Sequence, residues 1–189
     1  MEIKTQTTMA VANFAIELAL KQKQDLSYLK LCEVLFFLQG YYLDKYQQPL
    51  IDCVFKSNVH GVINEEIISE FKFYGPGNIE SPKINLDFSS FSLLHGGGEI
   101  KSYQEEVDLP KIQLEELQKV TQTLISKPSW QLVKVIINHR THKDPVINEL
   151  SEILGHGRTY EYAEYTNSEI EACFADNKKW LLTLDPRKN

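Results

Sequence analysis

Residues 29–52 read LKLCEVLFFLQGYYLDKYQQPLID, and this stretch decides how the chain folds. Of the fifteen residues 28–42, eleven are apolar or aromatic, and they fall on nearly every side of a helix. A helix that is apolar all round has to be buried at the centre of its domain. The polar residues 44–48 and then Pro49 end the helix and begin an extended segment. The stretch therefore predicts a central buried helix that ends near Lys45.

Further helices are predicted around it from apolar residues at helical spacing, from cap residues and from helix breakers. The central helix itself is expected to begin after a cap at Asp25 or Ser27. The other predicted helices are residues 8–22 after a cap at Thr7 or Thr8, a helix capped by Asn64 and stopped by Gly75-Pro76-Gly77, one across Leu114–Leu124, one opened by Ser126 and Pro128, one from Pro145 to about Leu154, and one that follows the capping box Thr166–Glu169.

The β content is predicted to be small. Residues 53–57 favour a short strand, and the irregular residues 76–111 favour one or two edge strands with a glycine-rich turn at 95–98. Residues 177–189 are typical of a solvated tail. With no repeat and no linker, residues 1–189 predict one mainly α, compact multi-helix domain with a central buried helix and a minor β element.

Packing faces follow from the same spacing. In the helix opened by Ser126 and Pro128, we expect Trp130, Val133 and Ile137 to face inward. In the last helix, Cys173 is expected to be buried with its apolar neighbours.

Composition excludes several functional classes. The net charge of −6 and the absence of a basic run argue against nucleic-acid binding by this chain. The longest apolar run, residues 34–38, is far shorter than the roughly 20 residues that span a bilayer. The N-terminus has no signal-peptide pattern, and the three cysteines form no CxxC pair. We expect a cytoplasmic protein that does not bind a membrane, and we leave open whether it forms a homo-oligomer.

No catalytic motif is complete. His95-Gly96-Gly97-Gly98 resembles an oxyanion loop, but the G-x-S-x-G nucleophile elbow that such a loop requires does not occur in the sequence. His139 and His142 are three residues apart, as a metal pair on a helix can be, but no HExxH pattern accompanies them. We therefore expect no catalytic residue, no cofactor and no metal. A metal-dependent enzyme using the His139/His142 cluster is the alternative.

Partner binding is predicted in the second half of the chain. Polar residues close one helix, and a loop rich in tyrosine follows, a composition enriched at protein interfaces. The candidate partner-binding residues are His142, Lys143, Asp144, Arg158, Tyr160, Tyr162 and Tyr165. Half-buried packing of the tyrosine rings is the alternative to exposure at an interface.

Three segments resemble the Panacea domain, the family that includes the SocA-like antitoxins. Residues 29–52 are similar to the family's opening run LKLxKLLYFxQGYYLxxxxxPLxD. Residues 57–75 end in the family's EFKxYG, with Gly61 at the expected glycine but Ser57-Asn58 in place of Ala-Trp and Val62 in place of Pro. Residues 141–145, THKDP, are similar to a THxxxPW element, with Val146 in place of Trp. The similarity covers residues 9–75 and about 112–175.

This resemblance implies a function without catalysis. It implies an antitoxin of a toxin–antitoxin system that neutralises a cognate toxin, encoded by an adjacent gene, by direct protein–protein binding. The family resemblance leaves two alternatives. One is an adaptor that delivers the toxin to an ATP-dependent protease, and the other is a phage-associated regulator without a toxin partner.

Overall fold

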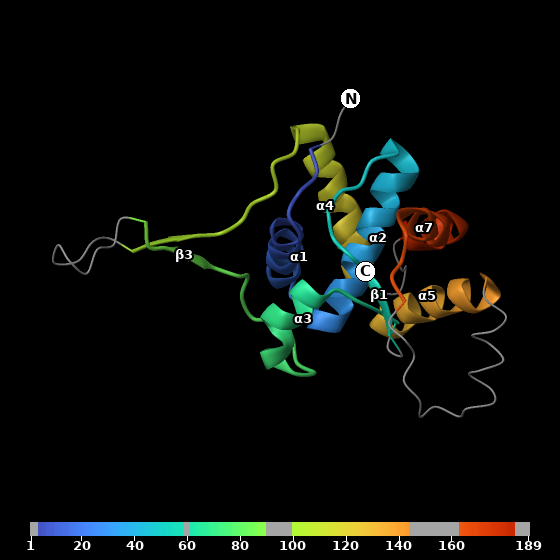
Figure 1. Cartoon of the computed structure of the whole chain (residues 1–189), viewed down its shortest axis with the longest axis horizontal. Helices are drawn as coiled ribbons and strands as arrows, with labels where there is room; N and C mark the ends of the chain where they lie inside the picture. The colour runs from blue at the N-terminus through green and yellow to red at the C-terminus, as the bar shows by residue number, and fades with distance from the viewer. Residues whose placement is uncertain (1–3, 59–60, 90–99, 144–162, 184–189) are drawn as a thin grey trace.

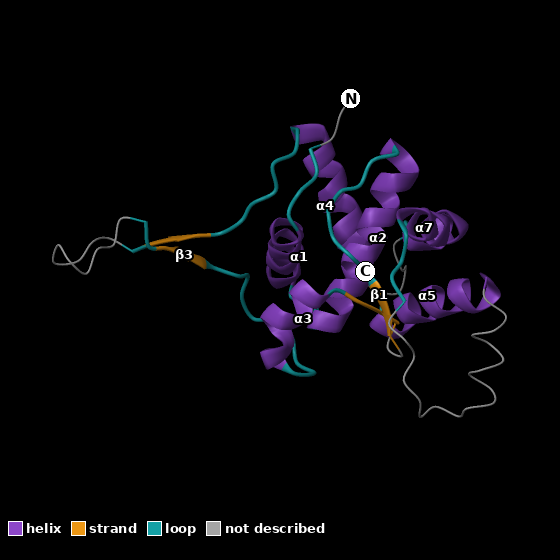
Figure 2. Ribbon diagram, in the orientation of Figure 1, coloured by secondary structure: helices purple, strands orange, loops and turns teal. Residues whose placement is uncertain are grey.

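The computed structural model describes residues 4–58, 61–89, 100–143 and 163–183. In these ranges the chain is mainly helical, with two small antiparallel hairpins (Figure 2), as the sequence predicts. The helices are α1 (Thr8–Gln22), α2 (Tyr28–Tyr46), α3 (Glu65–Phe71) followed by a 3-10 turn (Lys72–Tyr74), α4 (Lys111–Ser126), α5 (Ser129–Lys143) and α7 (Asn167–Leu181). The strands are β1 (Lys56–Asn58), β2 (Gly61–Ile63), β3 (Asn85–Asp87) and β4 (Lys101–Tyr103).

Polar caps determine where four of these helices begin. The side chains of Thr7, Ser27, Asn64 and Thr166 each accept a hydrogen bond from the backbone N–H three residues further on. Each bond satisfies one of the N–H groups that have no partner inside the helix. At Thr166 the carboxylate of Glu169 completes the predicted capping box. The cap predictions at these four positions are confirmed.

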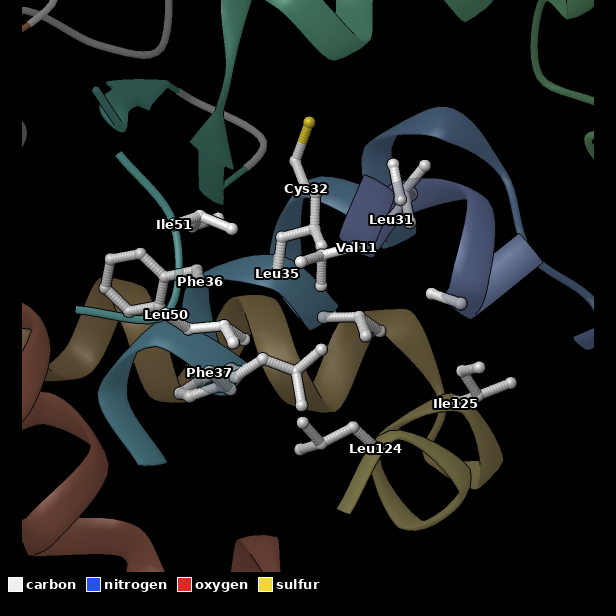
Figure 3. Packing of buried hydrophobic residues seen from close by; sticks show 14 of the residues in the cluster. Val11, Leu31, Cys32, Leu35, Phe36, Phe37, Leu50, Ile51, Leu124 and Ile125 are labelled. Carbon is white, nitrogen blue, oxygen red and sulfur yellow. The ribbon is translucent and has the colours of Figure 1, made fainter. Parts of the chain in front are cut away.

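Helix α2 occupies the centre of the molecule, as predicted. It contacts α1, α3, α4, α5, α7 and β2, and Figure 1 shows it between α4 and α7. Leu35, Phe36 and Phe37 are fully buried, and so are side chains on the other sides of the helix. Figure 3 shows residues of α2 meeting Val11 of α1, Leu124 of α4 and the segment at Leu50 in one cluster.

The inward face of α5 differs from the prediction. Leu132 and Ile136 are buried, whereas Trp130 is 65% exposed and Ile137 is 38% exposed. Both sets satisfy the helical period, because Leu132 and Ile136 are four residues apart and Trp130 and Ile137 are seven apart. The positions of α2 and α7 beside α5 decide between them. Val133 is half-buried and lies against Gly61.

Two boundaries also need correction. Helix α7 continues to Leu181, so residues 177–181 are helical and do not belong to a tail, because the buried side chain of Leu181 extends the apolar face of Phe174 by two turns. The strand expected at residues 53–57 lies at Lys56–Asn58 and pairs with β2. The helix predicted from Pro145 and the turn at 95–98 lie outside the described residues.

The edge strands predicted in residues 76–111 are present. Strands β3 and β4 pair into a hairpin, which extends away from the helices as an arm (Figure 1). Over the described residues, none of the helices has the length and hydropathy that crossing a membrane requires.

Candidate functional site

The histidine pair of the sequence lies on α5, and its first member faces inward. The side chain of His139 is 8% exposed, and its Nε2 lies 3.3 Å from Oδ2 of Asp176 on α7. This contact links the two helices. His142 and Lys143 belong to the last turn of α5, while their side chains and all of Asp144, Arg158, Tyr160 and Tyr162 lie outside the described residues. Within the described part of the chain, no group of three or more His, Cys, Asp or Glu residues is placed to hold a metal ion.

Tyr165 is the one candidate partner-binding side chain that the structure describes. It is half-buried, and its ring meets the ring of Phe36 edge-on at 5.0 Å between centroids. Its backbone N–H donates to the carbonyl of Phe55 over 2.8 Å. Tyr165 therefore packs against the core, which was the alternative considered for these tyrosines.

The polar residue of the QGYYL sequence, Gln39, has a structural role. Its buried Oε1 accepts from the backbone N–H groups of Leu50 and Ile51 over 2.9 and 3.0 Å, and its Nε2 donates to the carbonyl of Ile51 over 3.1 Å. Buried backbone groups without such partners would cost free energy. Gln39 thus holds the PLID segment against α2.

Gly40 has a structural role as well. A Cβ atom added at Gly40 would lie 2.6 Å from Cβ of Phe174. The glycine therefore allows α7 to cross α2 at close range, where a larger residue would force the two helices apart. Residues that carry the family resemblance thus determine how the helices pack.

A buried polar cluster at the start of α2 was not predicted from the sequence. Glu33 is 1% exposed, and both of its carboxyl oxygens lie 2.9 Å from the hydroxyl oxygen of Ser129. Burial raises the pKa of Glu33 to about 8, against the opposing effects of the Ser129 hydrogen bond and the charge of Lys30. At neutral pH Glu33 is therefore mainly in its protonated form.

Lys30, one turn before Glu33, connects three elements. Its Nζ donates to the carbonyls of Asp25 and Ile125 over 2.9 and 2.6 Å. The second bond satisfies a carbonyl in the last turn of α4, where a cation is favoured by the helix dipole. The spacing of Lys30 and Glu33 in an otherwise apolar helix is the signal that could have revealed this cluster.

A cavity of about 570 Å³ lies beside the cluster. Lys30, Lys127 and Ser129 are among the residues that line it. Nζ of Lys127 donates to the carbonyl of Thr183 over 2.7 Å and lies 4.5 Å from the centre of the Trp180 ring. The ammonium groups of Lys30 and Lys127 therefore bind backbone carbonyls at or near the ends of helices. The cavity lies where these elements meet.

Two cysteines are poor nucleophiles in this structure. Burial raises the pKa of both Cys32 and Cys53 to about 12. Neither thiol then forms appreciable thiolate at neutral pH, and the thiolate is the reactive form. Cys173 is buried, as the sequence predicts.

Comparison with known proteins gives no relative. No family model, no curated protein and no solved structure matches this chain.

Proposed function

We propose that this protein is a cytoplasmic antitoxin that neutralises a cognate toxin, the product of an adjacent gene, by direct binding. The observation that carries the proposal is the resemblance of residues 29–52 to the opening run of the Panacea domain. The resemblance extends to residues 57–75 and 141–145.

The roles of the matched residues support this assignment. Gln39 and Gly40 hold α2 against the segment that follows it and against α7, so the shared sequence specifies a scaffold. A scaffold leaves the side chains on its surface free to vary with the partner. Binding to a protein also fits the described residues, in which burial raises the pKa of the Glu33 carboxyl to about 8 and the pKa of the Cys32 and Cys53 thiols to about 12.

We place the toxin-binding surface on the outer face of α5 and on the residues after it. Trp130 and Ile137 are exposed on that face, seven residues apart, and His142 and Lys143 follow in the last turn. Tryptophan is enriched among residues that dominate binding energy. A typical interface of roughly 800 Å² per partner extends beyond these side chains. We therefore include Asp144, Arg158, Tyr160 and Tyr162 in the proposed surface. Tyr165 is excluded because it packs against Phe36. The net charge of −6 favours a basic partner.

The proposal is tested by expressing the adjacent gene with and without this protein. We expect the neighbour to be lethal alone and harmless together with the parent protein. Trp130→Ala and His142→Ala are expected to weaken protection and to lower the affinity of the purified complex by tenfold or more, about 1.4 kcal/mol or more. Their melting temperatures should stay within about 2 °C of the parent value.

The matched control is Ile112→Ala. Ile112 is 71% exposed on α4, so its truncation removes a similar apolar surface from a different face. It should protect as well as the parent. A harmless neighbouring gene would contradict the proposal, and full protection by Trp130→Ala and His142→Ala would contradict the placement of the surface. Protection that requires an ATP-dependent protease, without a stable complex of the two purified proteins, would support the adaptor mechanism.

A further inference from the structure

The arm formed by β3 and β4 carries exposed apolar side chains. It extends away from the helical body on the side of α1 and α3 (Figures 1 and 2). Ile84, Leu86, Phe88 and Ile100 are 61%, 56%, 54% and 46% exposed. A monomeric protein rarely leaves large apolar side chains together in water, and such a group marks an interaction surface.

The pairing of the arm places these side chains on one face. Leu86 lies opposite Ser102, and Asp87 lies opposite Lys101. Residues opposite each other point to the same face, and successive residues point to opposite faces. Ile84 and Phe88 therefore share the face of Leu86, and the same register continued by one residue places Ile100 opposite Phe88.

The other face of the arm is polar. Asn85 lies opposite Tyr103, and Asp87 and Lys101 form a pair of opposite charges. Residues 84–88 therefore alternate between apolar and polar side chains, as in a sheet with one covered face and one face in water. Its apolar face, however, is exposed.

The base of the arm is held firmly against α1. Asn13 is fully buried, and its side chain bonds both sides of the arm: Oδ1 accepts from the N–H of Lys83 over 2.8 Å, and Nδ2 donates to the carbonyls of Lys83 and Glu105 over 3.2 and 3.4 Å. Nζ of Lys83 also contacts Oε2 of Glu70 over 2.7 Å. An arm fixed at its base presents its apolar face in a set direction, which reduces the entropy lost on binding.

We propose that a second copy of this chain covers the apolar face, so that two arms pack face to face about a two-fold axis. A two-stranded hairpin alone is marginally stable in water, and a second layer supplies the packing it lacks. In a two-fold contact the same surface meets itself. The apolar face suits this arrangement because its described side chains carry no charge, so no like charges meet across the axis.

The area and the charge are consistent with a weak dimer. The exposed parts of Ile84, Leu86, Phe88 and Ile100 amount to on the order of 450 Å² per chain. Two copies would bury on the order of 900 Å², close to the roughly 1,000 Å² of the smallest specific interfaces. Each chain carries a net charge of −6, and contact through extended arms keeps the two bodies apart.

The test is the mass of the full chain in solution, measured by sedimentation equilibrium from about 1 to 500 µM. We expect the parent to form a dimer with a dissociation constant of about 10–100 µM. Leu86 is the middle residue of Ile84, Leu86 and Phe88, so Leu86→Asp is expected to bring the carboxylates of the two copies close together and to raise the dissociation constant at least tenfold. Mixing Leu86→Asp with Leu86→Lys should restore a heterodimer.

Tyr103→Asp provides the matched control. Tyr103 is 54% exposed in the same hairpin but lies on the polar face, so this variant should dimerise like the parent. Circular dichroism at about 1 µM checks that each variant is folded. A parent that stays monomeric up to 500 µM would overturn the proposal, as would a dimer unaffected by Leu86→Asp. A monomeric parent whose Leu86→Asp variant no longer protects cells would assign the arm to the toxin, and the second copy would be rejected.

Discussion

Glu33 shows how one residue can make stability depend on pH. Its carboxyl group is enclosed between α2 and the start of α5, where ionisation would create a negative charge that water cannot solvate. Burial is the largest influence on its pKa and raises the pKa from an ordinary value of 4.5 to about 8. Between pH 4.5 and pH 8, Glu33 therefore keeps its proton in the folded protein but has lost it in the unfolded chain.

This difference predicts that the free energy of unfolding decreases as pH rises through that window. The contribution of Glu33 is largest below pH 4.5 and is lost as pH approaches 8, with a total on the order of 3–5 kcal/mol. Glu33→Gln resembles the protonated acid and cannot ionise. Urea unfolding at several pH values should show a shallower slope in this variant than in the parent.

The control for this prediction is Glu115→Gln, which removes an exposed carboxyl group on α4. Its slope should equal that of the parent. Equal slopes in the parent and Glu33→Gln would mean that Glu33 is ionised in the folded protein.

At the level of the element, α2 determines the packing of the other helices. Phe36 alone makes edge-on ring contacts with Phe37, Phe55 and Tyr165, with centroids 5.0 to 5.6 Å apart. Phe37 follows Phe36 on α2, whereas Phe55 and Tyr165 come from two segments further along the chain. Truncation of a buried side chain on α2 therefore affects contacts with several other elements of the core.

Phe36→Ala and Leu35→Ala are expected to lower the free energy of unfolding by roughly 2–5 kcal/mol each, because both side chains are fully buried. Such a loss is a large part of the roughly 5–15 kcal/mol that stabilises a typical domain. Urea unfolding followed by circular dichroism measures it. Ile112→Ala, the exposed control, should change stability by less than about 0.5 kcal/mol. Loss of less than 1 kcal/mol in both core variants would place the core elsewhere.

On the scale of the whole molecule, nearly all the buried apolar side chains of the described residues belong to one cluster. It joins residues of α1, α2, α3, α4, α5 and α7. Helix α7 packs closely on α2, although more than 120 residues separate Gly40 from Phe174. Elements that share one core are expected to unfold together.

The predicted outcome is a single cooperative unfolding transition. Trp130 and Trp180, on α5 and α7, report on the second half of the chain by fluorescence, whereas far-ultraviolet circular dichroism reports on all helices. The two urea curves should coincide. Phe174→Ala should shift both curves together, because Phe174 is fully buried between α7 and α2. A fluorescence change at lower urea than the helical change would reveal two independently folding units.

Much of the fold followed from local sequence. Eleven of the fifteen residues 28–42 are apolar or aromatic and lie on nearly every side of the helix, and a helix of that kind is stable only at the centre. Caps such as Ser27, Asn64 and Thr166 act within three residues, so their sequence positions were enough to place the helix starts. The candidate site could not be predicted in the same way, because the exposure of Tyr165 and of the side chains of α5 depends on which distant segments pack against them.

Only the tertiary structure decided which of several equally spaced side chains are buried and which are exposed. In α5, Leu132 and Trp130 both satisfy the helical period, and the neighbouring helices selected Leu132 for burial. Tyr165 was a candidate for partner binding, with half-buried packing as the alternative, and its contacts with Phe36 and Phe55 hold it against the core. Glu33 became a buried acid with a raised pKa because the elements packed around α2 remove it from water, and the hydrogen bond from Ser129, 96 residues away, only partly opposes that effect. Each of these outcomes depends on contacts between distant segments, which local spacing does not specify.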